Sequence, residues 1–223
     1  HTRCSRDWSS DVCSSDLKAS LFVIVAPSGA GKTTLVHALL RSRPGIKLSI
    51  STTTRLPRQS ERHGEHYFFV DEARFVELQK NGQFLESAFV HGHYYGTSSS
   101  FVEETLANGD DLLLEIDCQG ASQIKRLFPE AVVIFIAPPS VEELRRRLHA
   151  RAQDDEATIA RRIEGAKKEL QRAHEADYLV INDDFDQALL DLQRIVEASA
   201  LRYHLRFSRF PLLAERLGLR SGS

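Results

Sequence analysis

The sequence lacks the features that would place it in several specialised classes of protein. No apolar run is long enough to cross a membrane, so we expect no membrane-spanning segment. Lysine and arginine total 29 residues against 31 aspartates and glutamates, which leaves a formal net charge of −2. Because there is no basic excess, a dedicated nucleic-acid-binding surface is not expected.

Cysteine is scarce and methionine is absent. The cysteines, Cys4, Cys13 and Cys118, form neither a disulfide framework nor the spacing of a metal site, which predicts a protein of the reducing cytoplasm. The opening stretch HTRCSRDWSSDVCSSDL is rich in serine, aspartate and cysteine and lacks the apolar core of a signal peptide. We expect residues 1–17 to be a non-native adaptor or vector tail, with a genuine disordered tail as the alternative, and exclude them from fold reasoning.

The rest of the chain has the pattern of an α/β protein. With 223 residues, 42% of them apolar, it can form one domain with a core of its own, or one domain carrying inserted subdomains. The apolar runs LFVIV, DDLLLEID, AVVIFIA and YLVIND predict buried strands, and helical patterns lie between several of them. This alternation predicts a central parallel sheet. The polar segment 51–97 does not follow it and is expected to form an inserted subdomain.

The stretch FVIVAPSGAGKTTLVHALL contains a phosphate-binding loop between a predicted strand and a predicted helix. Gly29 and Gly31 allow backbone N–H groups to turn toward a phosphate chain, and the new helix points its positive dipole end at the same anion. Lys32 would contact the β- and γ-phosphates, and the Thr33 hydroxyl would ligate Mg²⁺. Ala26 stands where a first glycine is expected, and its methyl group is tolerable if its φ is ordinary. The predicted ATP-binding residues are Ala26, Pro27, Ser28, Gly29, Ala30, Gly31, Lys32, Thr33 and Thr34.

The polar segment contains SISTTTRLPRQSERHGEHYFFV, in which Arg55 and Arg58 are followed by Glu61 and Tyr67. Two guanidiniums and a phenol this close in sequence suit a clamp for a second, smaller phosphate. Taken alone, Arg-x-x-Arg also suits a solvated loop.

The same segment resembles the signature of the guanylate kinases, T-T-R-x-x-R-x-x-E-x-x-G-x-x-Y-x-F. The stretches APSGAGK, YYGTS, LEIDCQGA, FIAPPS and INDDFD follow the order found in that family, so the resemblance runs from about Ala19 to the C-terminus. It implies a P-loop NTPase three-layer fold with a central parallel sheet, an inserted GMP-binding subdomain and a helical lid. It also implies ATP-dependent phosphorylation of GMP to GDP with Mg²⁺, by direct in-line transfer.

The resemblance also implies boundaries. The kinase-like domain would span residues 18–207, with a C-terminal tail at 208–223. Within the domain, the core would comprise 18–50, 98–142 and 175–207, the GMP-binding subdomain 51–97 and the lid 143–174.

For the acceptor site, the resemblance implies one group of residues around the GMP phosphate and another around the base. A carboxylate such as Glu86 can accept from guanine N1–H and the N2 amine, whereas O6 needs a hydroxyl donor such as Ser51 or Thr97. Asp117, at the end of a predicted strand, could also serve Mg²⁺ through water, or merely cap the strand end. The predicted GMP-binding residues are Ser51, Arg55, Arg58, Glu61, Tyr67, Glu86, Tyr95, Thr97 and Asp117.

The resemblance also implies that Arg147, Arg151 and Arg162 belong to a mobile lid, close over the transferring phosphoryl group and balance its developing charge. Alone, the arginine run RRRLHARA would more often be a solvated helix face. The family often has R-G-R-G here, whereas this chain has Ala150 and Ala152, which stiffens the expected hinge of the lid. The predicted catalytic residues are Lys32, Arg147, Arg151, Arg162 and Asp117.

Two other functions fit parts of the sequence. A guanylate-kinase-like module that binds phosphopeptides would share the acceptor clamp, but such modules typically have degraded phosphate loops. A kinase for another small phosphorylated acceptor would not need the guanine-side carboxylates and hydroxyls. The sequence leaves the oligomeric state open.

Overall fold

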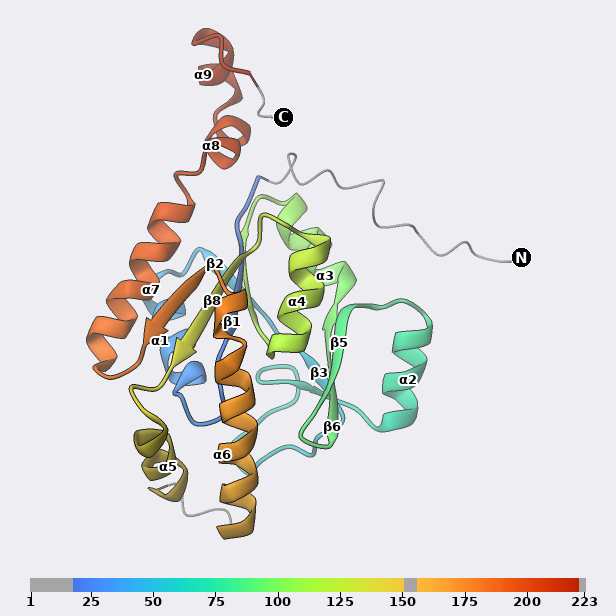
Figure 1. Cartoon of the computed structure of the whole chain (residues 1–223). Coiled ribbons are helices and arrows are strands. Elements are labelled where there is room, and N and C mark those ends of the chain that lie inside the picture. The colour runs from blue at the N-terminus through green and yellow to red at the C-terminus, as the bar shows by residue number, and fades with distance from the viewer. Residues whose placement is uncertain (1–17, 151–155, 221–223) are drawn as a thin grey trace.

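The computed structural model describes residues 18–150 and 156–220, and within them the chain is built around a five-stranded parallel sheet (Figure 1). The strand order is β2-β7-β1-β8-β9, which places β1 at the centre. Val23 of β1 pairs with Leu114 of β7 on one side and Val133 of β8 on the other. The strands are β1 (Leu21–Val25), β2 (Ile46–Ser49), β7 (Asp111–Glu115), β8 (Val132–Ala137) and β9 (Tyr178–Ile181).

Helices cover both faces of this sheet and complete three layers. Side chains alternate along β1, so that Val23 faces one buried cluster and Ile24 faces the other. On the Ile24 side lie α1 (Lys32–Ser42) and α7 (Phe185–Ser199). On the Val23 side lie α3 (Ser99–Ala107) and α4 (Cys118–Leu127). Because each strand of the sheet centre is buried on both faces, its sequence is a continuous apolar run, as predicted.

A second, four-stranded sheet lies within the polar segment and has the order β4-β3-β6-β5. Helix α2 (Glu72–Lys80) packs on it through Phe75, whose ring centroid is 4.6 Å from that of Phe84 and 5.3 Å from that of Tyr94. These ring contacts form an apolar interface between α2 and the small sheet. Its strands are β3 (Thr52–Thr53), β4 (Phe68–Phe69), β5 (Phe84–Val90) and β6 (His93–Ser98).

Helices α5 (Val141–Ala150) and α6 (Glu156–Gln171) lie beside each other below the sheet in Figure 1. They share a small apolar cluster that includes Leu144, Leu148 and Ile163. The Ser140 side chain accepts a hydrogen bond from the Glu143 N–H at 3.0 Å and so caps the start of α5. A 3₁₀ turn, η2 (Ala173–Glu175), follows α6 and leads into β9.

Beyond α7 the structure differs from the sequence-based expectation. Two further helices, α8 (Tyr203–Arg209) and α9 (Pro211–Arg216), extend from the end of α7, and α9 lies where a tail was expected. Pro211 at the first turn of α9 was an available signal.

The predicted N-terminal tail, residues 1–17, lies outside the residues that the structure describes. Among the residues that the structure describes, no helix combines the length and the apolar character needed to cross a membrane.

Candidate active site

The loop between β1 and α1 has the backbone shape that a phosphate-binding loop requires. Gly29 and Gly31 both adopt positive φ, at 91° and 92°. A Cβ atom at Gly31 would collide with the side-chain amide of Asn182, so this position needs glycine for space as well as conformation. Within the described residues, only His91 among the non-glycines has positive φ. Ala26 therefore has an ordinary φ, and its methyl group does not prevent the loop from forming.

Two side chains at the start of α1 reach the carboxyl end of β7. The Lys32 ammonium group donates to the carbonyl oxygen of Ile116 at 3.0 Å. The Thr33 hydroxyl donates to Oε1 of Glu115 at 2.6 Å. Glu115 was not singled out from the sequence, although its place two residues before Asp117 at a strand end was a usable signal. A hydroxyl and a carboxylate this close form an oxygen-donor pair suited to Mg²⁺, which takes few protein ligands and completes its shell with water and phosphate oxygens.

A buried carboxylate lies across from the loop. Glu86 of β5 is 4% exposed, and the Thr97 hydroxyl of β6 donates to its Oε1 at 2.6 Å. Burial raises the pKa of Glu86 to about 7, the Thr97 hydrogen bond opposes that rise, and the nearby Asp117 carboxylate adds to it. A Cβ atom at Gly120 would lie 2.5 Å from Oε2 of Glu86, so the first turn of α4 touches this carboxylate through glycine.

Asp117 has a structural role and faces the same space. Its Oδ1 accepts from the Gly120 N–H at 2.9 Å, which caps the start of α4. Asp117 also lines the cavity between the loop and Glu86. The strand-end cap and the site position that the sequence offered as alternatives therefore coincide in one residue.

The predicted phosphate clamp is held together by charge and aromatic contacts. Arg55 and Glu61 form an ion pair at 2.8 Å, and the second oxygen of Glu61 accepts from the Arg58 N–H at 2.8 Å. The Arg55 guanidinium lies 5.4 Å from the centre of the Tyr67 ring, which in turn meets the Tyr95 ring edge-on at 6.1 Å. Burial, the largest cause, raises the pKa of Tyr67 to about 12. The Tyr67 phenol therefore stays protonated at neutral pH and can donate a hydrogen bond.

One cavity of about 250 Å³ joins the loop to the buried carboxylate. It does not touch five predicted residues: Ala30, Arg55, Glu61, Thr97 and Arg147. It also includes residues that were not predicted as site residues: Ala88, Val90, His91, Glu115, Ile116 and Glu169. The predicted residues that line it are Ala26, Pro27, Ser28, Gly29, Gly31, Lys32, Thr33, Thr34, Ser51, Arg58, Tyr67, Glu86, Tyr95, Asp117 and Arg162.

Comparison with known proteins places this geometry in a family. The guanylate kinase family model matches residues 18–199. The chain belongs to the guanylate kinase family. The guanylate kinase of Methylobacillus flagellatus is 53% identical over 201 residues, which cover 90% of this chain and 100% of that protein. That of Chromobacterium violaceum is 49% identical over 199 residues, covering 89% and 95% of the two chains.

A solved structure agrees with the fold. The crystal structure of guanylate kinase from Anaplasma phagocytophilum superimposes with a TM-score of 0.75 at 30% identity, covering 92% of this chain and 98% of the other. The predicted α/β fold with a central parallel sheet and the suspected family are both confirmed.

The arginines predicted for the lid of this guanylate kinase family member fall in three different situations. Arg162 of α6 donates from Nη2 to the Ser28 hydroxyl at 2.6 Å and so reaches the phosphate-binding loop. Arg147 of α5 instead donates to the carbonyl oxygen of Asn182 at 2.9 Å and is held by Glu143 at 2.7 Å. Arg151 lies outside the described residues. Only Arg162, of the two arginines described, lines the cavity.

Two unpredicted polar side chains support the loop. The Asn182 amide donates to the carbonyl oxygen of Ala30 at 2.6 Å, which connects the end of β9 to the loop. Glu169 of α6 lines the cavity, and its Oε2 is buried without a hydrogen-bond partner among the described residues. Burial raises the pKa of Glu169, and the positive charge of Lys32 opposes that rise. Asn182 belongs to the stretch INDDFD, which indicated the family but not this contact, and Glu169 belongs to none of the quoted stretches.

Proposed function

We propose that this chain is a guanylate kinase that transfers the γ-phosphoryl group of ATP to GMP and forms ADP and GDP. The observation that carries the proposal is the continuity of one cavity from the phosphate-binding loop to the buried Glu86. A donor and an acceptor nucleotide bound in this space would have their phosphates side by side, as in-line transfer requires.

On the donor side, the loop residues 26–34 bind the phosphates of ATP. The glycines at positive φ turn backbone N–H groups toward the phosphate chain, and Lys32 exchanges its carbonyl partner for phosphate oxygens. Thr33 and Glu115 would hold Mg²⁺. When bound, the ion neutralises phosphate charge. The role proposed for Glu115 is additional to the sequence-based prediction.

On the acceptor side, Glu86 reads guanine by accepting hydrogen bonds from N1–H and the N2 amine. Its desolvated position makes those bonds strong and makes a base without the donors costly to bind. Ser51 lines the cavity and offers a hydroxyl for O6, Thr97 holds Glu86 through its own hydroxyl, and Asp117 lines the same side. Arg55, Arg58, Tyr67 and Tyr95 bind the GMP phosphate, with Glu61 holding Arg55 and the Arg58 backbone in place.

Catalysis comes from positioning and charge neutralisation, and the acceptor oxygen is already an anion that needs no strong base. Arg162 and Arg151 would close on the transferring group. Arg147 would act while its guanidinium donates hydrogen bonds to the carbonyl oxygens of Asn182 and Ala30, at the loop. We place the activity in the cytoplasm, where both nucleotides occur, with ATP and GMP rather than nucleic acid as partners.

The test is a coupled assay of ADP release with GMP, dGMP, AMP, UMP and ribose phosphates as acceptors. We expect turnover with GMP and Mg²⁺, and rejection of AMP by roughly 10⁴-fold in kcat/KM. A phosphopeptide-binding module would show no turnover with any acceptor. A kinase for another acceptor would prefer a phosphorylated sugar or pyrimidine nucleotide to GMP.

A further inference from the structure

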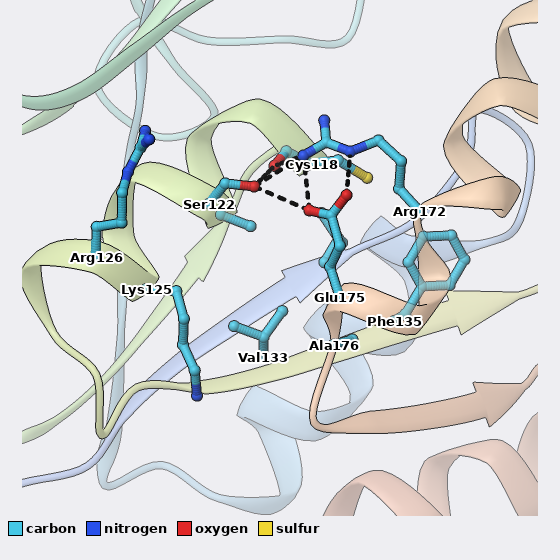
Figure 2. A pocket seen from close by; sticks show the side chains of 11 residues that line it. Cys118, Ser122, Lys125, Arg126, Val133, Phe135, Arg172, Glu175 and Ala176 are labelled. Atoms are coloured by element: carbon cyan, nitrogen blue, oxygen red, sulfur yellow. Dashed lines mark hydrogen bonds and ion pairs between the residues drawn. The ribbon is translucent and has the colours of Figure 1, made fainter.

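A second cavity, of about 240 Å³, lies beside the active site between α4, strand β8 and the segment that follows α6 (Figure 2). Val133 and Phe135 of β8 and Ala176 form an apolar part of its wall. Ala173 and Ala176 pack against the apolar cluster that contains Cys118 and Ala121, and the cavity opens beside this contact. Polar contacts also cross from one segment, residues 172–176, to the other, the start of α4.

Arg172, directly after α6, crosses from one segment to the other. Its Nη2 donates to the carbonyl oxygen of Cys118 at 3.1 Å and to the Ser122 hydroxyl at 2.8 Å. Glu175 braces the guanidinium through both carboxylate oxygens, at 2.7 and 2.8 Å. The Ser122 hydroxyl also lies 3.0 Å from Glu175 (Figure 2). We call Arg172, Glu175, Ser122 and the Cys118 carbonyl the α4 clamp.

The charges of the α4 clamp persist at every pH at which the protein would be assayed. The hydrogen bond from Arg172 is the largest cause that lowers the pKa of Glu175 to about 2. A fork of two parallel N–H donors on a carboxylate fixes the direction of the guanidinium as well as its charge. Nη2, which bonds Glu175, is thereby also directed at α4.

The turn of α4 that the clamp holds is also the turn that shapes the guanine side of the active site. Asp117 caps this turn through the Gly120 N–H at 2.9 Å. Gly120 itself lies so close to Glu86 that a Cβ atom there would be 2.5 Å from the carboxylate. A shift of this turn by a fraction of an ångström would therefore move Asp117 and alter the space available to Glu86. The clamp holds it from the side opposite the cavity that contains Glu86.

We propose that Arg172, braced by Glu175, is a positioning residue for GMP that holds the first turn of α4, and through it Asp117 and Glu86, in the geometry that binds guanine. The inference rests on the proposed function. Arg172 does not line the active-site cavity, so it acts through α4 rather than by touching a substrate.

The first experiment uses Arg172→Met, which keeps most of the aliphatic stem and removes the guanidinium. We expect the Kd for GMP, measured by calorimetry without ATP, to rise about tenfold, because small misplacements of binding groups carry penalties of this order or larger. KM for GMP should rise in parallel, while KM for ATP stays within about twofold. Arg126→Met is the matched control: Arg126 lines the same cavity from α4, is exposed, and points away from the clamp in Figure 2. It should leave both constants unchanged.

Ser122→Ala is a milder second variant that removes one acceptor of Arg172. It should raise the Kd for GMP by a smaller factor, and the double variant should lose less than the product of the two single losses, because both act on one network. An unchanged Kd for GMP in folded Arg172→Met or, should that variant not fold, in Ser122→Ala overturns the inference. Equal losses of GMP and ATP affinity overturn it as well, since they indicate general destabilisation. Wild-type protein that binds no GMP would refute the proposed function itself, and the inference with it.

Discussion

At the scale of single residues, Glu86 is the side chain that we propose selects the acceptor. It is a carboxylate in a desolvated position, with one hydroxyl donor from Thr97 and a glycine of α4 against its other oxygen. Such a group loses free energy when it faces anything but hydrogen-bond donors. Guanine supplies two donors on the edge that Glu86 would meet, whereas adenine presents a lone pair at N1 and has no N2 amine.

Glu86→Gln tests this assignment. The variant keeps the size of the side chain but loses its charge. Its side-chain NH2 group would also face an N–H donor of guanine, with which it cannot form a hydrogen bond. Each charge-assisted hydrogen bond contributes about 1.5–3 kcal/mol, so we expect kcat/KM for GMP to fall at least ~10²-fold. ATP affinity should barely change, and AMP should lose less than GMP. Steady-state kinetics with both acceptors decides the matter: an unchanged GMP-to-AMP ratio would show that Glu86 does not read the base.

The raised pKa of Glu86 also predicts a pH dependence of stability. Its pKa in the folded protein, about 7, lies above its ordinary value of 4.5, so the folded state binds this proton more tightly than the unfolded state. The free energy of unfolding of the ligand-free protein should therefore fall as the pH rises from 4.5 to about 7, by at most roughly 3 kcal/mol from this group.

Urea unfolding of the wild-type protein and of Glu86→Gln across pH 4.5 to 7 measures how much the Glu86 carboxyl group contributes to the free energy of unfolding. The difference in stability between the two proteins should shift in favour of the variant as the pH rises through this window. A difference that stays constant with pH would show that Glu86 ionises normally.

Lys32 is proposed to supply a point charge to the transferring phosphate. Lys32→Ala removes that charge from a site shielded from water, and we expect kcat to fall roughly 10²-fold or more, by analogy with the loss of a single transition-state donor. Lys47→Ala is a suitable control, because Lys47 is a half-exposed lysine of β2 whose ion pair is with Asp110. If Lys32→Ala turned over GMP at the wild-type rate, the loop would not be the catalytic phosphate site.

At the scale of elements, helix α6 connects the parts of the active site. Arg162 and Glu169 are seven residues apart and so lie on the same face, and both line the active-site cavity. Arg162 reaches the Ser28 hydroxyl, and Arg172 just beyond the helix reaches α4. The helix and the residue that follows it thus contact the donor loop and α4.

Arg162→Ala should lower kcat much more than it raises KM for GMP, because the closing contact forms mainly in the transition state. Its neighbour Arg161 is exposed and bonds to Thr158 on the same helix, so Arg161→Ala is the matched control and should keep wild-type kinetics. Arg151→Ala is expected to behave like Arg162→Ala. A rise in KM for GMP with an unchanged kcat would show that these arginines bind GMP and are not catalytic.

At the scale of the whole molecule, the three-layer core, the small sheet and helices α5 and α6 all contribute to the proposed active site. Every residue proposed to bind ATP or GMP belongs to residues 26–117, and the proposed catalytic arginines follow them in α5, in α6 and between these helices. None of these side chains comes from residues 1–17. The N-terminal stretch is thus dispensable for the site as we have built it.

Deletion of residues 1–17 should therefore leave the melting temperature and GMP kinase activity unchanged. Thermal unfolding and the coupled assay on the shortened and full chains measure both. A drop of several degrees would show that this stretch packs on the domain, which a foreign tail would not do.

The sequence by itself determined the parts of this protein that depend on neighbouring residues. The buried strands and the phosphate-binding loop could both be predicted, because local backbone geometry and burial on both faces leave a pattern along the chain. Glu86 and Asp117 came from the resemblance to the family rather than from any pattern of spacing.

Only the tertiary structure decided which distant side chains meet. Glu115 became a partner of Thr33, and Asn182 a support for Ala30, because parallel strands bring their carboxyl ends to one edge of the sheet. The contact of Arg172 with α4 and the burial that raises the pKa of Glu86 arise in the same way, from elements that are far apart in sequence. Through-space contacts and desolvation leave no local periodicity, so residue spacing alone could not reveal them.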